Sequence, residues 1–513
     1  MKKIISAVLT AAVLMSVMTS AAYAGNAGYF RSEISEIESL IQNCRDKGIS
    51  TDYEDVCLAT MQRFAGYIED DEAAGYNSSL IAYDKQAMLD MYNETKSNLN
   101  AYLSGMKEPL NANLADMRDL SNDGFALFEK GKPVYSIGYG HFNTAMEDVE
   151  NFRGFGANNI QLECGPSKVQ PIENDNLASW TFVKEISSGT CSEEITSSSV
   201  TEGKSSLKIS VQDSKGRIYQ NLFLERGYDY KLSFDIRGSK GLSVKVHWGD
   251  YVVPVDYSGN WRSIAIDINK KNVSNHLPFY ISAEGSGTLF IDNIKACKKN
   301  ESDSYIINGG FEDELYSENI SLILKTLAKA SDSNVGVSVL LSPHLFPKNL
   351  TGENIYSDSP EFIQYIVDAP VPKGIIEDYL RYFIPIISKY SSVTNICLSN
   401  EPLYDTRYSP NFYNPKFRDY LAEKYGTIAK INSLYGTSYS DFSDTQMPTI
   451  KTPNHINMSE PLAYDWVLFN RSIFADWHKW MADIIKEYTD IPLNGSSRQT
   501  QPGPRRPWRR QRW

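Results

Sequence analysis

A carboxyl group at position 401 is the first candidate for chemistry in this sequence. Asn400-Glu401-Pro402 directly follows the apolar segment 394–399. A glutamate can transfer a proton to or from a reacting oxygen, and cleavage of a glycosidic bond uses two carboxyl groups, one protonated and one ionised. Asn400 can hydrogen-bond a substrate hydroxyl beside the acid. Alone, the Asn-Glu pair is a weak signal, because a surface carboxylate in a turn has the same sequence.

Other polar residues follow predicted strands. His141 comes after the first strand, Glu163 after the second and His344 after the third, while Tyr404 follows Glu401 closely. In a barrel of parallel strands, residues at the C-terminal strand ends surround the active site. We therefore predict that these four side chains contact substrate. The histidines can instead be hydrogen-bonded loop residues, and Glu163 can instead pair with a neighbouring base.

The elements that must position these residues alternate between strands and helices. Predicted strands occupy 133–142, 156–163, 335–341, 394–399 and 491–494, and predicted helices occupy 146–152, 317–330, 375–390, 416–425 and 466–488. Such alternation predicts an α/β fold with parallel strands. Five strands fall short of the eight that close a (β/α)8 TIM barrel. The predicted fold class is therefore an incomplete TIM barrel.

Two further regions differ from the predicted barrel in their pattern of apolar and polar residues. Residues 172–305 contain short alternating segments at 206–211, 230–236, 242–248, 263–268 and 288–292. This stretch is too long for an ordinary loop, and its many short strands predict an inserted all-β jelly-roll sandwich. Residues 25–130 show apolar positions at helical spacing, interrupted at 48–50 and 75–77, which predicts an N-terminal helical region.

The two ends of the chain have distinctive compositions. Lys2 and Lys3 precede the apolar run 4–18 and the triplet Ala22-Tyr23-Ala24, which predicts a signal peptide over 1–24 and a secreted protein. The run is shorter than the roughly 20 apolar residues that span a membrane. Residues 498–513 contain six arginines, three prolines and no acidic residue, an atypical composition that can be non-native sequence or a basic surface tail. The predicted insert, 172–305, divides the predicted barrel into two parts, 131–171 and 306–497.

Net charge and cysteine spacing argue against nucleic acid, metal ions and cofactors as ligands. The formal net charge of −12 argues against a nucleic-acid partner, which requires clustered lysine and arginine. The six cysteines show no C-x-x-C spacing, so we predict neither a metal site nor a cofactor. Export permits disulfides, and Cys44 with Cys57, which flank a predicted turn, is one possible pair.

The sequence after Glu401 resembles a known family. Residues 417–437 read FRDYLAEKYGTIAKINSLYGT, and a long aromatic-rich helix follows. This pattern resembles clan A glycosidases, most closely the family 42 β-galactosidase-like enzymes, over 131–171 and 308–495. The resemblance implies a retaining hydrolase of β-linked glycans with Glu401 as general acid/base. It also places the nucleophile on a Glu after strand seven, so we expect this chain to be a truncated form that lacks it.

The predicted sandwich resembles a family 4/9 carbohydrate-binding module. The segments that carry this resemblance are 203–209, 224–234, 259–261 and 289–294. It implies a carbohydrate ligand, and the rings of Trp248, Tyr251 and Trp261 are candidates for stacking on a sugar. Because side chains alternate along a strand, these rings can instead pack the core. A non-catalytic carbohydrate-binding protein, or an inactive fragment, is therefore the competing function.

Overall fold

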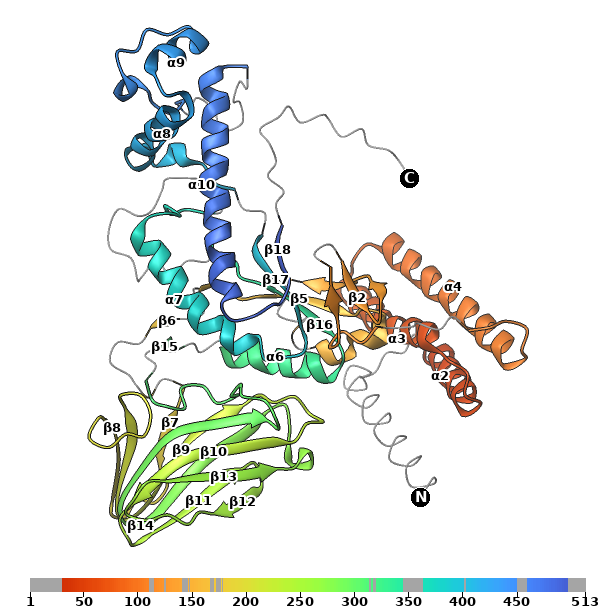
Figure 1. Ribbon diagram of the computed structural model, residues 1–513. Coiled ribbons are helices and arrows are strands. Elements are labelled where there is room, and N and C mark those ends of the chain that lie inside the picture. The colour runs from red at the N-terminus through yellow and green to blue at the C-terminus, as the bar shows by residue number, and fades with distance from the viewer. Residues whose placement is uncertain are drawn as a thin grey trace. The chain divides into compact units, whose positions relative to one another are not determined.

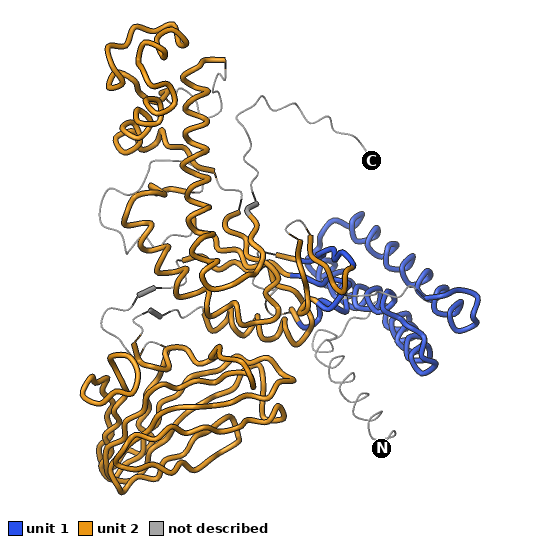
Figure 2. Tube along the Cα trace, viewed as in Figure 1, with its two compact units in different colours: residues 1–116, 132–138, 150–159 blue, residues 117–131, 139–149, 160–513 orange. Residues whose placement is uncertain are grey.

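The computed structural model describes residues 30–496 except for 110–114, 124–125, 141–145, 147, 167–169, 172–176, 178, 313–314, 317–319, 345–362, 401–402 and 450–458. The chain divides into two compact units (Figure 2). Unit 1 comprises Met1–Asp116, Lys132–Gly138 and Glu150–Asn159, and unit 2 comprises the remainder. His141, Glu401, the predicted signal peptide and the tail 498–513 lie outside the described residues.

The described part of unit 1 is mainly helical. Its long helices are α2 (Arg31–Asp46), α3 (Asp52–Ala74) and α4 (Ser78–Leu103). α3 ends at Gly75, whose φ of 70° suits a residue without a side chain. The Asn77 side chain caps α4 by accepting a hydrogen bond from the Ser79 amide at 2.9 Å. The N-terminal helical region is thus confirmed.

A five-stranded sheet in the described part of the chain carries the candidate residues. Its strands are β4 (Gly138–Gly140), β5 (Asn159–Glu163), β16 (Gly336–Leu340), β17 (Val393–Asn400) and β18 (Leu493–Ser496). Their order is β18-β17-β16-β5-β4, so strands consecutive in the α/β pattern are neighbours. Figure 1 labels four of them, β5, β16, β17 and β18. β17 runs parallel to both β16 and β18. The described residues thus form an incomplete barrel, as predicted.

The first predicted strand, 133–142, is divided into two. β3 (Lys132–Val134) joins a small sheet with β1 (Ser121–Asn122) and β2 (Leu127–Glu129), and β4 belongs to the parallel sheet. Gly138 explains the close approach of β4 to β5, because a Cβ there would lie 1.7 Å from the Asn159 carbonyl oxygen. The predicted helix at 146–152 is a 3-10 helix, η1 (Val149–Phe155).

Helices connect the strands of the sheet. They are α6 (Ile320–Asp332), α7 (Pro370–Ile387), η5 (Thr406–Tyr408), α8 (Pro410–Tyr425), α9 (Ile428–Tyr435), η6 (Phe442–Asp444) and α10 (Pro461–Lys486). An aromatic-rich cluster of buried side chains joins α8, α9 and α10. Within it, the buried Asp465 carboxylate accepts a hydrogen bond from the Tyr425 hydroxyl and pairs with the Lys424 ammonium, each at 2.6 Å. α10 is therefore anchored along its N-terminal half.

The predicted insert is an all-β sandwich. Its strands are β7 (Thr181–Lys184), β8 (Thr190–Thr196), β9 (Ser206–Leu222), β10 (Tyr230–Gly238), β11 (Leu242–Trp248), β12 (Tyr251–Pro254), β13 (Arg262–Ile268) and β14 (Leu277–Lys298), with the 3-10 helix η3 (Lys270–Asn272). Every recorded pairing among them is antiparallel. The two longest, β9 and β14, pair with each other along most of their length, with a bulge between Gly285 and Gly287. The two segments that lead into and out of the insert also pair, as β6 (Gln170–Pro171) and β15 (Leu315–Tyr316).

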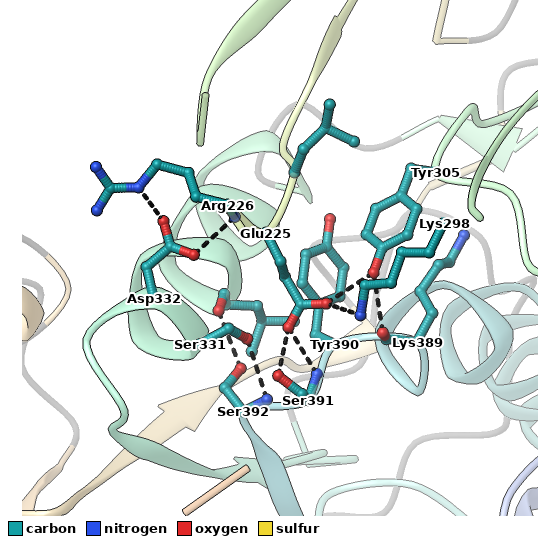
Figure 3. Close-up of polar contacts among 12 residues, drawn as sticks. Glu225, Arg226, Lys298, Tyr305, Ser331, Asp332, Lys389, Tyr390, Ser391 and Ser392 are labelled. Carbon is teal, nitrogen blue, oxygen red and sulfur yellow. Dashed lines mark hydrogen bonds and ion pairs between the residues drawn. The ribbon is translucent and has the colours of Figure 1, made fainter. Parts of the chain in front are cut away.

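A buried carboxylate joins the sandwich to the barrel part of unit 2 (Figure 3). Glu225, 1% exposed and just after β9, pairs with Lys298 at the end of β14. It also accepts hydrogen bonds from the Ser391 amide at 2.9 Å, the Ser391 hydroxyl at 2.5 Å and the Tyr305 hydroxyl at 2.9 Å. Ser391 lies between α7 and β17, so the contact is made at the N-terminal end of a barrel strand.

The neighbouring residue strengthens this junction. The Arg226 amide donates to Asp332 Oδ1 at 2.8 Å, and its guanidinium pairs with the same carboxylate. Asn275 Nδ2 donates to Asp332 Oδ2 at 2.7 Å. Asp332 ends α6, just before β16, so the sandwich contacts the N-terminal ends of two adjacent barrel strands.

The electrostatic balance at Glu225 favours the charged form. Burial alone raises the pKa of this carboxyl, but the charge and hydrogen bond of Lys298, with hydrogen bonds from Ser331 and Ser391, outweigh that cost. The pKa of Glu225 therefore lies below its ordinary value. A buried carboxylate held in this way requires its partners to stay in place.

Candidate active site

The C-terminal ends of β5, β16 and β17 bring together three of the predicted residues. Glu163 ends β5, Asn400 ends β17, and His344 lies four residues beyond the end of β16. All three are partly buried. Because the strands that carry them are neighbours in one sheet, their C-terminal ends share an edge, which is where barrel enzymes place their active sites.

A hydrogen bond ties two of these strand ends together. The Ser342 hydroxyl donates to Glu163 Oε1 at 2.6 Å. Ser342 is fully buried and has a φ of 42°, a left-handed conformation that is uncommon for residues other than glycine. Strain of this kind is typical of functional sites. Sequence reasoning did not single out Ser342, because backbone strain leaves no trace in residue type.

Glu401 and His141 lie outside the described residues, so only their places in the chain are known. Glu401 is the residue after Asn400, the last residue of β17, and His141 is the residue after Gly140, the last residue of β4. Asn400 is paired in register with Ser496 of β18. The strand that leads to the predicted acid is therefore held on both sides, by β16 and by β18.

Tyr404, predicted to contact substrate, is engaged by the protein itself. Its hydroxyl lies 2.6 Å from the Tyr413 hydroxyl and 3.4 Å from the Val367 amide. Tyr413 in turn donates to Asp368 Oδ1 at 2.5 Å. Burial raises the pKa of Tyr404 well above its usual value. These bonds link Tyr404 to Asp368 through Tyr413, and its contact with substrate stays a prediction.

Sequence reasoning missed a polar pair that includes Ser399, two positions before the predicted acid in the sequence. Ser399 Oγ lies 2.6 Å from His478 Nε2, and His478 Nδ1 lies 2.9 Å from the Phe474 carbonyl oxygen. A carbonyl can only accept, so Nδ1 carries the proton and Nε2 accepts from the serine hydroxyl. Burial lowers the pKa of His478, which favours this neutral form. Two polar residues of the aromatic helix, Asn470 and His478, each four positions from Phe474, were the available signal.

The sandwich places its predicted sugar contacts differently from one another. Trp248 is 1% exposed, and its ring packs against Tyr230 and Phe279 in the core, so it offers no face to a sugar. Tyr251 is 42% exposed. Trp261 is partly buried, with the Arg237 guanidinium 5.9 Å from its ring centre. Side chains alternate between the two faces of a strand, and Trp248 lies on the inward face of β11. The sequence alone did not show which face that is.

A row of rings on one sheet of the sandwich was also missed. Tyr219, Tyr280 and His247 are direct cross-strand partners on β9, β14 and β11, and all are partly exposed. The His247 and Tyr280 rings stack with centres 4.0 Å apart. The Arg217 guanidinium lies 4.8 Å from the Tyr280 ring centre and pairs with Glu185 at 2.9 Å.

Three other properties bear on the site. Among the described residues, no group of three or more His, Cys, Asp or Glu is arranged to hold a metal ion.

The six cysteines all fall within the described residues and are free thiols, so Cys44 and Cys57 are not joined. Within the same ranges, none of the helices has the length and apolar character needed to cross a bilayer.

Comparison with known proteins finds a family match in the region that contains β17. The family model described as beta-galactosidase, glycoside hydrolase family 42, matches residues 388–502. The chain is 28% identical over 191 residues to a beta-1,2-glucosyltransferase from Ignavibacterium album, a match that covers 33% of this chain and 25% of that protein. The chain thus spans about a quarter of the length of this curated relative.

Solved structures of low sequence identity show similar parts. The apo exo-carrageenase GH42 from Bacteroides ovatus is 15% identical, with 92% of this chain and 48% of that chain covered and a TM-score of 0.48. TmCBM61 in complex with beta-1,4-galactotriose is 19% identical, with 25% of this chain and 94% of that chain covered and a TM-score of 0.22. The family match contains β17, Asn400-Glu401 and α8 to α10. Over residues 388–502 the chain is therefore similar to the glycoside hydrolase family 42 proteins that this model describes.

Proposed function

We propose that this protein is a retaining glycoside hydrolase that cleaves β-linked galactosides or similar glycans, with Glu401 as the general acid/base. The observation that carries the proposal is the position of Asn400-Glu401 at the C-terminal end of β17, inside the family match. The protonated carboxyl donates to the departing sugar oxygen and, as a carboxylate, then accepts a proton from water. Asn400 hydrogen-bonds a sugar hydroxyl beside the scissile bond.

The nucleophile belongs to the same proposal. A retaining mechanism needs a second carboxylate about 5 Å from the first, and the family resemblance places it after strand seven. The described sheet contains five strands. We propose that the second carboxylate follows strands that are not among them.

The experiment that tests the function compares the parent with Glu401→Gln on a nitrophenyl and an alkyl β-galactoside. Parent and variant are each measured in two forms. One form is the 513-residue chain, and the other is a longer chain that continues past residue 497. Turnover that depends on Glu401 in either form supports the proposal. Measurable turnover that is equal in parent and variant shows that Glu401 is not the acid/base.

Glycan binding by the sandwich is a second candidate function. The observation that favours it is the row of Tyr219, Tyr280 and His247 on one face of the sheet. The row crosses three strands, about 10 Å at the usual strand spacing, so it can contact more than one sugar ring. Because the His247 and Tyr280 rings stack on each other, the row would offer a sugar its ring edges and hydroxyl groups, and neighbouring charged groups such as Arg217 and Glu185 can hydrogen-bond sugar hydroxyls.

Replacing Tyr280 by alanine is expected to weaken the binding of a β-linked galacto-oligosaccharide roughly tenfold, since it removes the central ring of the row. Isothermal titration calorimetry or affinity electrophoresis measures the change. Tyr83→Ala is the matched control, because Tyr83 is an exposed tyrosine of unit 1 and its loss should leave affinity unchanged. If Tyr280→Ala binds as tightly as the parent, the row is not the glycan site.

A further inference from the structure

We propose that one face of α10 positions the segment that carries Asn400 and Glu401, with His478 and Asn470 as positioning residues. The inference rests on the proposed role of Glu401. Residues 470, 474 and 478 are spaced by four, so they lie on one face of the helix. Each contacts the chain immediately before or after the proposed acid.

His478 holds the chain before Glu401. Its Nε2 accepts the Ser399 hydroxyl at 2.6 Å, and its Nδ1 is fixed by the Phe474 carbonyl at 2.9 Å. The rings of Phe474 and Trp477 lie 4.4 and 5.0 Å from the imidazole, centre to centre, and pack against it edge-on. The imidazole therefore cannot turn without losing both hydrogen bonds and its packing.

Asn470 holds the chain after Glu401. Its Nδ2 donates to the Tyr404 carbonyl oxygen at 2.9 Å, and its Oδ1 accepts from the Thr406 amide at 2.8 Å. Phe474 adds a stacked contact with the Tyr404 ring at 6.2 Å between centres. Trp466, one turn earlier on α10, donates from Nε1 to the Thr406 hydroxyl at 3.0 Å. All polar groups of the Asn470 amide thus act on this segment.

Both ends of the segment are fixed by the same rigid element. Ser399 and Tyr404 are five positions apart. α10 is hydrogen-bonded to Ser399 through His478 and to Tyr404 through Asn470. Fixing the ends of so short a segment removes most of its conformers, so less entropy is lost when the acid reaches the geometry for proton transfer. The proposed effect of the helix face on the acid therefore acts through Ser399, Tyr404 and Thr406, which it contacts.

The first test measures amide hydrogen exchange in the printed chain. In Asn470→Leu, exchange at 403–408 is expected to rise roughly fivefold or more, as for the loss of a typical hydrogen bond. Ser399→Ala is expected to shift the His478 Nε2 resonance and leave Nδ1 protonated. Lys479→Leu is the control, since Lys479 is exposed on the same helix and pairs only with Asp483 among the recorded ion pairs. Exchange at 403–408 that is unchanged in Asn470→Leu overturns the inference.

The second test uses leaving groups, in whichever form of the protein shows turnover. An alkyl galactoside needs a proton from the acid, whereas a dinitrophenyl galactoside departs without one. His478→Leu and Asn470→Leu are expected to lower kcat/KM for the alkyl substrate roughly 10- to 100-fold, and for the dinitrophenyl substrate less than about threefold. His478→Gln, which keeps an acceptor, is expected to recover most of the loss.

The outcomes separate the inference from the function on which it rests. If Glu401→Gln shows the leaving-group difference but the α10 variants slow both substrates equally, the helix face has only a structural role and the inference is wrong. If Glu401→Gln itself shows no leaving-group difference, the proposed role of Glu401 fails, while the exchange experiment still decides whether α10 fixes the segment.

Discussion

In a form of the protein that shows turnover, Glu401→Ala is expected to lower kcat/KM for an alkyl β-galactoside by about 10² to 10⁴, the usual contribution of general acid catalysis. For a dinitrophenyl galactoside the first step needs no proton, so sugar transfer to the enzyme continues. The second step slows, because water is no longer deprotonated as it attacks. Steady-state and pre-steady-state kinetics on the two substrates measure this difference, with a burst of dinitrophenolate expected for the variant.

Azide identifies which carboxyl has been removed. It is already anionic and attacks the sugar carbon without a base, so the carbon–oxygen bond to the nucleophile breaks, a carbon–nitrogen bond forms and the nucleophile's carboxylate is released. Glu401→Ala should therefore be accelerated by azide and yield a β-glycosyl azide. An α-glycosyl azide would assign Glu401 as the nucleophile, and no azide product with full activity would remove it from the mechanism.

Glu225→Gln is expected to destabilise the protein by about 3 to 5 kcal/mol, because it leaves the buried Lys298 ammonium without a counter-charge. Urea unfolding followed by tryptophan fluorescence measures the loss. The double variant Glu225→Gln/Lys298→Met should recover a large part of it, since the unpaired charge is gone. Lys295→Met, on the same strand with an exposed partner, should cost less than about 1 kcal/mol.

The same carboxyl gives the stability a pH dependence of known sign. Because the pKa of Glu225 is lower in the folded protein than its ordinary value of 4.5, its contribution is fully present above that pH. The contribution is lost as the pH falls through the lower folded pKa. Glu225→Gln should therefore show a flatter loss of stability on acidification than the parent, and identical slopes would mean that the Glu225–Lys298 pair is not formed in solution.

Much of the fold follows from local pattern. The apolar segment 394–399 predicted β17, observed as Val393–Asn400, and 335–341 predicted β16, observed as Gly336–Leu340. Helix starts were less well placed. α7, α8 and α10 begin at Pro370, Pro410 and Pro461, five or six residues before the predicted starts. Proline suits the first helical turn because its missing amide would be unpaired there, so these starts were readable in principle.

Longer-range features were not readable in the same way. The segment 288–292 was predicted as a strand of its own, whereas β14 runs from Leu277 to Lys298, because a bulge lets the chain pass Gly285 and Gly287 without leaving the sheet. Likewise, the inward direction of Trp248 could be assigned only from the register of β11, which the sequence does not show.

The missed contacts share one physical cause. Ser399 and His478 are 79 positions apart, and Glu225 and Ser391 are 166 apart. A glutamate or a serine is normally exposed, so residue type gave no reason to bury Glu225. Pairings of this kind depend on the three-dimensional course of the chain, which local periodicity does not contain.

The attachment of the sandwich at Ser391 and Asp332 has a consequence for long substrates. β17 has eight residues, from Val393 to Asn400, and spans about 26 Å at the usual rise. The contacts at Ser391 and Asp332 are thus separated by the height of the sheet from the strand ends that carry Glu163 and Asn400. If the sandwich binds glycan as proposed, its removal should slow attack on insoluble material and spare small soluble galactosides.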